Sequence, residues 1–504
     1  MPALVASAQA AAPIYADSHG YRFAVNGNRL LPAEVVVAVI ESAETPQQAL
    51  DALRLAYQKA GYPLVAFRGE VRDKLVAIDV INGRITALDV TPPSLTPFFT
   101  SLKGQEDLHL DTLIRTVSVA EFFAAREGMR PKVNFVAAEE VGGSKLVATE
   151  EPIEGASPWN AAVSFGNLGS RYSSRYLAQA SGAIRPGGGL ELAASYGQGI
   201  PGLSSDSAGS LYHSGALSAS LVTPWGLYGV SFLGTDYKIG ERAYPLYPEG
   251  QLYVGSITGS QLVFADPTSR LTLSEAFTHT DNSTYVFEGL YQLTDQSYDL
   301  VSVGATGNSS FALFGLNASL SASVTANFGI TPPRGTFLPT GLGIPSTRFA
   351  QVVGNVAYVQ SLPEGWSAAL TWSGQWADST LPQNQQWVLG GFGNLSAWLP
   401  AIMVGDKGTL GRATVSTPTW QWEGFSATGT AFAEWGLAGL DFAEPGVPSV
   451  RGASDAGISV SASYSTGTQL LFAYAWPLGS RNVPISALNR QGKANLYFSL
   501  SQSF

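Results

Sequence analysis

Residues 495–504, at the end of the chain, have the sequence NLYFSLSQSF, in which apolar and polar side chains alternate. The two faces consist of Leu496, Phe498, Leu500 and Phe504 on one side and Ser499, Ser501 and Ser503 on the other. A period of two residues indicates a β-strand. An apolar face toward lipid and a polar face toward a wet lumen are typical of a transmembrane β-barrel, although a soluble two-sheet sandwich alternates in the same way.

The same alternation continues through the chain from Trp159 onward, with turn signals such as Pro186-Gly-Gly-Gly189 and Pro363-Glu-Gly365 between the segments. Residues 302–333 contain no charge, but Gly, Ser, Asn and Thr interrupt them, so they do not resemble a transmembrane helix. Membrane strands must close into a barrel because lipid offers the backbone no hydrogen bonds. At about 20–22 residues per strand and connection, residues 158–504 predict a barrel of about 16 antiparallel strands.

The first 150 residues differ in composition, because charged side chains are about twice as dense there as in the rest of the chain. Their pattern predicts two α+β units, at residues 20–90 and 91–152. In the first unit we expect strands at 21–25, 64–68, 75–80 and 86–90 and helices at 32–42 and 46–60. In the second we expect helical stretches at 96–102 and 111–126 and strands at 132–137 and 145–149.

Composition excludes several classes of protein. The net charge of −10 and the lack of a Lys/Arg cluster argue against nucleic-acid binding. The chain has no cysteine, and its four histidines lack helical metal-ligand spacing, so we expect no metal and no cofactor. Residues 1–19 are interpreted as a signal-peptide remnant, with a cleavage-like Ala8-Gln9-Ala10, or as a disordered lead.

The first α+β unit resembles a polypeptide-transport-associated (POTRA) domain. The resemblance rests on the sequence from Phe23 to Asn28, on Gly61-Tyr62 and on the segment from Leu75 to Ile85. The second unit matches more loosely, through Leu113 to Gly128. Two such domains before a barrel resemble the outer-membrane transporter of two-partner secretion, the haemolysin/filamentous-haemagglutinin exporter family.

Several barrel segments carry the family resemblance, above all residues 374–377 followed by Leu389-Gly390-Gly391. In the family these precede a loop that folds into the lumen, with a Val-Arg-Gly-aromatic motif and then Gly-Asp-x-Gly. The corresponding residues here are Leu395, Ser396, Ala397 and Trp398, followed by Gly405, Asp406 and Gly408. The arginine and glycine of the first motif are therefore replaced.

The resemblance implies that the loop arginine pairs with a carboxylate of a Phe-x-Asp/Glu-x-Gly segment on the barrel wall, which here is Phe432, Glu434 and Gly436. Ser396 cannot supply the charge, although its hydroxyl could donate a hydrogen bond to Glu434. Arg412 and Arg451 are the candidate cations. Val450-Arg451-Gly452 spells the missing motif, but we expect it in the next extracellular loop.

The resemblance implies a non-enzymatic transporter that captures an unfolded exoprotein in the periplasm and exports it through the lumen. The other partners implied are outer-membrane lipid and the barrel-assembly machinery, for which Phe504 is the C-terminal signature. A barrel-assembly insertase and a passive porin remain alternatives. A hydrolase would need more than His279-Thr-Asp281, which we interpret as part of a solvated loop.

Overall fold

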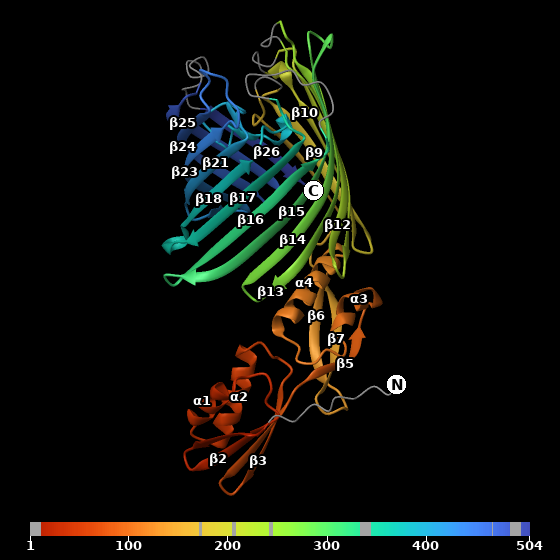
Figure 1. Ribbon diagram of the computed structural model, residues 1–504, viewed down its shortest axis with the longest axis vertical. Coiled ribbons are helices and arrows are strands. Elements are labelled where there is room, and N and C mark those ends of the chain that lie inside the picture. The colour runs from red at the N-terminus through yellow and green to blue at the C-terminus, as the bar shows by residue number, and fades with distance from the viewer. Residues whose placement is uncertain are drawn as a thin grey trace. The chain divides into compact units, whose positions relative to one another are not determined.

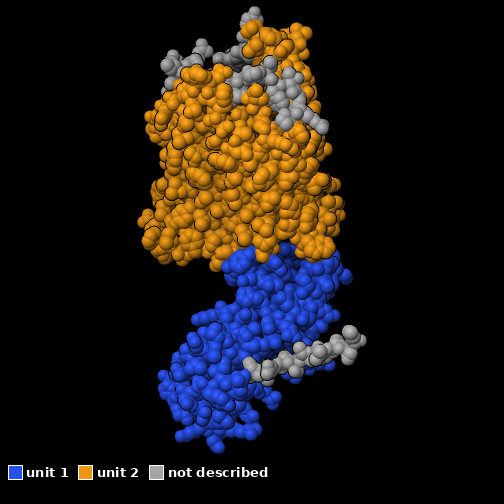
Figure 2. Space-filling model, viewed as in Figure 1, with its two compact units in different colours: residues 1–156, 264–267 blue, residues 157–263, 268–504 orange. Residues whose placement is uncertain are grey.

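The computed structural model describes residues 12–170, 174–203, 208–240, 245–332, 344–465, 467–483 and 495–504. It divides into two compact units, one formed mainly by residues 1–156 and the other mainly by residues 157–504 (Figure 2). No helix among the described residues is long and apolar enough to cross a membrane.

The first unit begins with a four-stranded sheet and two helices. The strand order is β1-β2-β4-β3, and β2 pairs in parallel with β4. The α2 helix begins where Thr45 accepts a hydrogen bond from the Gln48 amide, with Pro46 at its first position. Apolar residues of both helices bury against the sheet, with Ile40 and Leu53 inaccessible to solvent. The elements are β1 (Ile14–Ser18), β2 (Tyr21–Asn26), α1 (Ala33–Glu41), α2 (Pro46–Lys59), β3 (Ala66–Arg72) and β4 (Leu75–Ile81).

A second, smaller sheet follows in the same unit, with the order β5-β7-β6. Its core contains Phe99, Leu102 and Leu146, all fully buried. Gly128, with φ of 75°, ends the last helix, as a residue with positive φ commonly does. The elements are β5 (Arg84–Val90), η1 (Pro93–Leu95), α3 (Thr96–Phe99), η2 (Thr100–Leu102), α4 (Leu110–Arg126), β6 (Met129–Ala137) and β7 (Gly143–Pro152).

The structure corrects two of the sequence-based boundaries. Residues 14–18, predicted to belong to the leader, form β1, because Ala16 and Ser18 face the core and the strand pairs with β2; residues 1–11 lie outside the described residues. The strand predicted at 86–90 for the first unit is β5, which pairs with β7 of the second sheet. Asn82-Gly83 is a hairpin-like signal, but here the chain passes from one sheet to the next.

Residues 157–504 form a closed antiparallel barrel, which confirms the predicted fold class (Figure 1). Both β21 and β22 pair with β23, so they share one of the 16 strand positions. The strands are β8 (Trp159–Gly166), β9 (Leu177–Gly187), β10 (Leu190–Gly199), β11 (Leu211–Thr223), β12 (Gly226–Lys238), β13 (Glu249–Ala265), β14 (Ser269–Val286), β15 (Tyr291–Leu313), β16 (Leu316–Ile330), β17 (Arg348–Ser361), β18 (Ser367–Ala377), β21 (Lys407–Ser416), β22 (Trp420–Trp422), β23 (Phe425–Gly439), β24 (Val450–Tyr464), β25 (Thr468–Arg481) and β26 (Asn495–Ser503).

The barrel closes where β26 pairs with β8, over five residue pairs from Ser499↔Gly166 to Ser503↔Ala162. The side chain of Asn167 extends this seam: its Nδ2 donates to the Leu496 carbonyl at 2.9 Å, and its Oδ1 accepts from the Phe498 amide at 2.8 Å. At the other end of the seam the Phe504 amide donates to the Ala161 carbonyl at 2.8 Å. Asn167 therefore pairs with β26 beyond the last residue of β8.

Candidate functional site

The loop between β18 and β21, residues 378–406, carries the predicted lumen motif and is called the lumen loop below. Its tip is residues 390–398. Within it β19 (Trp387–Leu389) pairs with β20 (Met403–Gly405). The chain between these strands turns sharply, and Gly390, Gly391 and Leu395 all have positive φ. A Cβ atom on Gly390 would lie 1.9 Å from the Leu399 carbonyl oxygen, so only glycine fits there.

The tip of this loop is compact and buried. The Gly391 amide donates to the Trp398 carbonyl and the Trp398 amide to the Leu395 carbonyl, both at 3.0 Å. Leu395 and Ala397 are inaccessible to solvent and pack in one cluster with Phe432 of β23. The apolar residues of the two predicted motifs therefore form one buried cluster between the loop tip and the barrel wall.

Three strands of the barrel wall hold the loop tip through its backbone. The Ser396 amide donates to Oε2 of Glu434 in β23 at 2.6 Å, and the Ala397 amide donates to Oδ2 of Asp455 in β24 at 2.8 Å. The hydroxyl of Tyr497 in β26 donates to the Ser396 carbonyl at 2.6 Å. Hydrogen bonds to charged groups are about twice as strong as neutral ones, so Glu434, whose carboxylate pairs with Arg412, is the main anchor of the tip.

The predicted role of the Ser396 side chain differs from the observed one. Its Oγ accepts a hydrogen bond from the Gly393 amide at 2.9 Å, and the group that donates to Glu434 is the Ser396 backbone N–H. The reason is local: Leu395, at φ of 68°, turns two successive amides toward the wall. The loop tip therefore offers N–H groups where the family motif offers a guanidinium.

The cation at Glu434 comes from the barrel wall. Nη1 of Arg412 in β21 lies 3.0 Å from Oε1 of Glu434. The Cζ atom of the same guanidinium lies 4.7 Å from the centroid of the Phe432 ring, on its face. Arg412 and Glu434 are register partners in adjacent strands, and Glu434 is in turn the partner of Asp455. Two buried carboxylates and one guanidinium thus lie side by side on the inner wall.

Arg451, the other candidate, forms no ion pair within the part of the chain that the structure describes. It lies opposite Ala438 near the start of β24, so the prediction that it belongs to an extracellular loop was wrong. Its Nε atom is buried without a hydrogen-bond acceptor there.

The Gly-Asp-x-Gly segment ties the two ends of the loop to neighbouring structure. Asp406 is fully buried: Oδ1 accepts from the Leu381 amide and Oδ2 from the Asp441 amide, both at 2.8 Å. A Cβ atom on Gly405 would lie 2.5 Å from the Gly439 carbonyl oxygen, and one on Gly408 would overlap the Trp387 ring. The glycines are therefore required by close backbone and ring contacts.

The loop stem contacts a different part of the wall. Tyr298 of β15 donates its hydroxyl proton to Oδ1 of Asn384 at 2.6 Å, and Gln351 of β17 donates to the Gln385 carbonyl at 2.9 Å. A cavity of about 780 Å³ lies on this side, lined by loop residues such as Val404 and by wall residues such as Tyr237. Among the described residues that line it, none carries a charged side chain.

Two residues of the anchor, Asp455 and Tyr497, were not predicted. Asp455 is the single charged residue between Gly452 and Tyr464, and an isolated charge in a predicted barrel strand is the signal that could have identified it. His279, expected in a loop, lies on β14 instead, with Nδ1 2.8 Å from Oδ1 of Asp299. Within the described residues no group of three or more His, Asp or Glu side chains is placed to hold a metal ion.

Comparison with known proteins identifies the family and the fold of the chain. The model of the family "Haemolysin secretion/activation protein ShlB/FhaC/HecB" matches residues 142–441. No curated protein matches the sequence. The structure of CdiB from Escherichia coli is 16% identical, with a TM-score of 0.76 over 100% of this chain and 93% of that one.

Two further solved structures have the same fold at low identity. CdiB from Acinetobacter baumannii is 14% identical, with a TM-score of 0.70 over 98% of this chain and 91% of that one. BamA from Haemophilus ducreyi lacking POTRA domains 1–3 is also 14% identical, with a TM-score of 0.51 over 95% of each chain.

Proposed function

The chain belongs to the haemolysin secretion/activation family ShlB/FhaC/HecB, and we propose that it captures an unfolded exoprotein in the periplasm and exports it through its lumen. Membership makes the protein an outer-membrane transporter rather than an enzyme, with its N-terminal domains in the periplasm and a secreted exoprotein as its partner. Capture and the route through the lumen are the proposed steps.

The observation that carries the proposal is the asymmetric attachment of the lumen loop. Glu434 and Asp455 hold the tip against β23 and β24, while the cavity of about 780 Å³ lies toward the opposite side. The described residues that line the cavity offer hydroxyl, amide and apolar groups and no charge, so an extended chain with mixed side chains meets a neutral surface there. The cavity supports this route for the exported chain.

Capture is proposed to occur by strand addition at the edge of the first periplasmic sheet. Backbone pairing recognises any extended chain and needs no folded epitope. The edge strands of the two sheets are β1, β3, β5 and β6. β6 contains Pro131, which lacks an N–H donor, and β1 and β5 are largely buried or half-buried, whereas β3 contains no proline and most of its residues are exposed. We therefore assign the capture edge to β3.

Insertion of the barrel is proposed to require the barrel-assembly machinery, which would read the C-terminal strand ending at Phe504. The Phe504 side chain is 65% exposed, although its amide is paired with Ala161. An accessible terminal aromatic residue suits recognition before the β26–β8 seam closes.

The test is co-expression with a candidate exoprotein encoded by the adjacent reading frame, followed by assay of the medium. We expect secretion with the full chain and none with a variant lacking residues 20–150, provided heat-modifiable gel migration shows that its barrel is folded. Secretion by the deletion variant would contradict capture by these domains.

The same strains distinguish the alternatives. Uptake of small solutes without exoprotein secretion would favour the porin, and a defect in the assembly of other outer-membrane barrels on depletion would favour the insertase. Either result, with a folded barrel and no secretion, overturns the proposal.

A further inference from the structure

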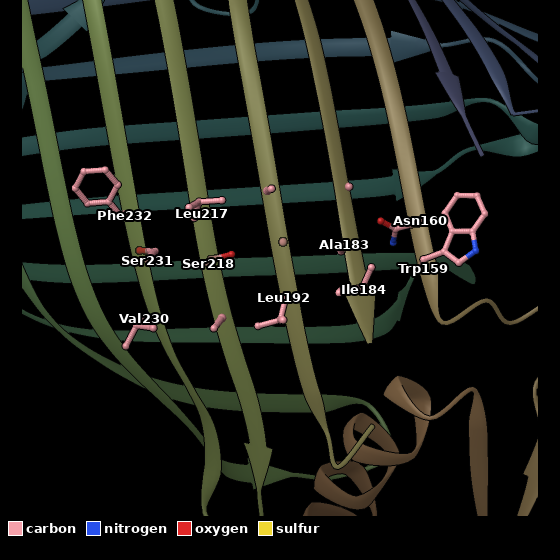
Figure 3. A pocket seen from close by; sticks show the side chains of 14 residues that line it. Trp159, Asn160, Ala183, Ile184, Leu192, Leu217, Ser218, Val230, Ser231 and Phe232 are labelled. Atoms are coloured by element: carbon pink, nitrogen blue, oxygen red, sulfur yellow. The ribbon is translucent and has the colours of Figure 1, made fainter. Parts of the chain in front are cut away.

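An apolar hollow lies on the outer face of the barrel, across β8 to β12 (Figure 3). Its volume is about 820 Å³, and its lining is almost entirely apolar. Trp159 borders it on β8, while Val230 and Phe232 border it on β12. The side chains at its rim are exposed, with 63% of Leu217 and 51% of Phe232 accessible.

Strand register shows that the hollow faces outward. Leu217 pairs with Phe232, and Ile184 pairs with both Trp159 and Leu192, so these side chains share one face of the wall. The adjacent positions, such as Ser218 and Ser231, belong to the lumen face. In an outer-membrane barrel the outward apolar face contacts lipid.

Small residues make the hollow deep. Gly182 and Ala194 are register partners on β9 and β10, and Ala219 of β11 pairs with Leu192 and Val230. Bulky residues stand on both sides of these positions, so the wall is recessed between them. A recess of this kind in a lipid-facing wall is filled by hydrocarbon, because lipid tails are the surrounding solvent.

A polar group adjoins one end of the hollow on the same face. Tyr228 lies two residues before Val230 on β12, and its hydroxyl is 3.4 Å from Nε2 of Gln261 in β13. The same Nε2 donates to Oε1 of Glu275 in β14 at 2.6 Å. The Glu275 carboxylate lies over Gly259, where a Cβ atom would be 2.2 Å from Oε1.

This carboxylate needs a positive partner. Glu275 is exposed on the outward face between Leu273 and Phe277, and it forms no ion pair within the described residues. A charge on the lipid face costs free energy unless it lies near the headgroups or is neutralised. Tyr228 follows the β11–β12 turn, at the end of the barrel where β8 begins, which is the periplasmic end.

We propose that the hollow and the Tyr228–Gln261–Glu275 group together form a binding site for a phospholipid of the periplasmic leaflet with a primary ammonium headgroup. An acyl chain fills the recess over Gly182, Ala194 and Ala219. The ammonium group pairs with the Glu275 carboxylate, and Gln261 holds that carboxylate in place. The site is independent of the lumen and of the exported chain.

The test is native mass spectrometry of the full chain in detergent, titrated with phosphatidylethanolamine or phosphatidylglycerol carrying identical acyl chains. We expect several-fold greater retention of phosphatidylethanolamine by the wild type. Glu275→Gln should abolish the headgroup preference, and Glu275→Lys should reverse it toward phosphatidylglycerol.

The recess is tested separately with Ala194→Leu combined with Ala219→Leu, which should reduce retention of both lipids. Ala322→Leu, at an outward position of β16, is the matched control and should retain lipid as the wild type does. Gel migration without heating checks that each barrel is folded.

Equal retention of the two lipids by the wild type, or a preference that survives Glu275→Gln, would overturn the assignment of the headgroup. Unchanged retention in the recess variant would overturn the assignment of the acyl chain. None of these readouts depends on secretion, so they stand apart from the proposed transport function.

Discussion

The lumen loop meets two unlike sides of the same barrel. Toward β21 to β26 its tip is buried and bound by two carboxyl groups and a tyrosine hydroxyl, and a guanidinium on the wall pairs with one of these carboxyl groups. Toward β11 to β15 it borders a cavity in which the lining residues that the structure describes carry no charge. One side holds the loop, and the other leaves space beside it. The exported chain could therefore use either of two routes: the pore could open by release of the loop tip, or the chain could pass through the cavity while the tip stays bound.

Removal of the main anchor should have the largest effect on this asymmetry. Glu434→Ala leaves the Ser396 amide without its acceptor and Arg412 without its carboxylate in a largely buried site. Breaking such a pair costs about 3–5 kcal/mol, so we expect the tip to detach. Hydrogen–deuterium exchange of residues 390–398 should rise, and single-channel conductance in planar bilayers should increase. Protection equal to that of the wild type would show that the remaining contacts suffice.

The two arginines offer a matched pair for the next test. Arg412→Met removes the cation from Glu434 and from the Phe432 ring, and we expect a loss of about 2–4 kcal/mol in loop anchoring. Arg451→Met makes the same change in β24 at a site away from Glu434 and should leave the loop in place. Exchange rates at the tip measure both variants, and equal effects would contradict the assignment of Arg412.

Asp406→Asn tests whether the two ends of the lumen loop, near Leu381 and Asp406, can loosen while the tip stays bound to β23 and β24. An asparagine keeps one acceptor oxygen, so either the Leu381 or the Asp441 amide loses its partner and faces an NH₂ group. We expect a cost of about 1–3 kcal/mol, with the ends loosened and the tip still bound. Because the chain has no cysteine, a single Val388→Cys probe can report accessibility by thiol labelling. Faster labelling with unchanged exchange at the tip would support this division.

The sequence was sufficient to predict the barrel, because alternation and turn residues recur along nearly 350 residues and closure is required by lipid. Local signals were insufficient where strands from distant parts of the chain meet. Asp455 joins the anchor only through its register with Glu434, and β5 joins the second sheet only through its pairing with β7. The cation could be narrowed to Arg412 or Arg451, but only the β21–β23 pairing distinguishes them.

The Ser396 side chain provides the smallest and most specific test. If the tip is held through its backbone, Ser396→Ala removes the hydrogen bond that Oγ accepts from the Gly393 amide and leaves the backbone bonds to the wall in place. The expected cost is about 0.5–1.5 kcal/mol, with both wall carboxylates still bound. Ser396→Arg, which restores the family residue, should weaken the anchor, because Ser396 is fully buried and Arg412 already occupies the cationic position. Hydrogen–deuterium exchange at residues 390–398 distinguishes the two cases. Faster exchange in the arginine variant would support the backbone anchor, because Arg412 of β21 already pairs with Glu434. Slower exchange would contradict it and show that a loop arginine can also bind the wall.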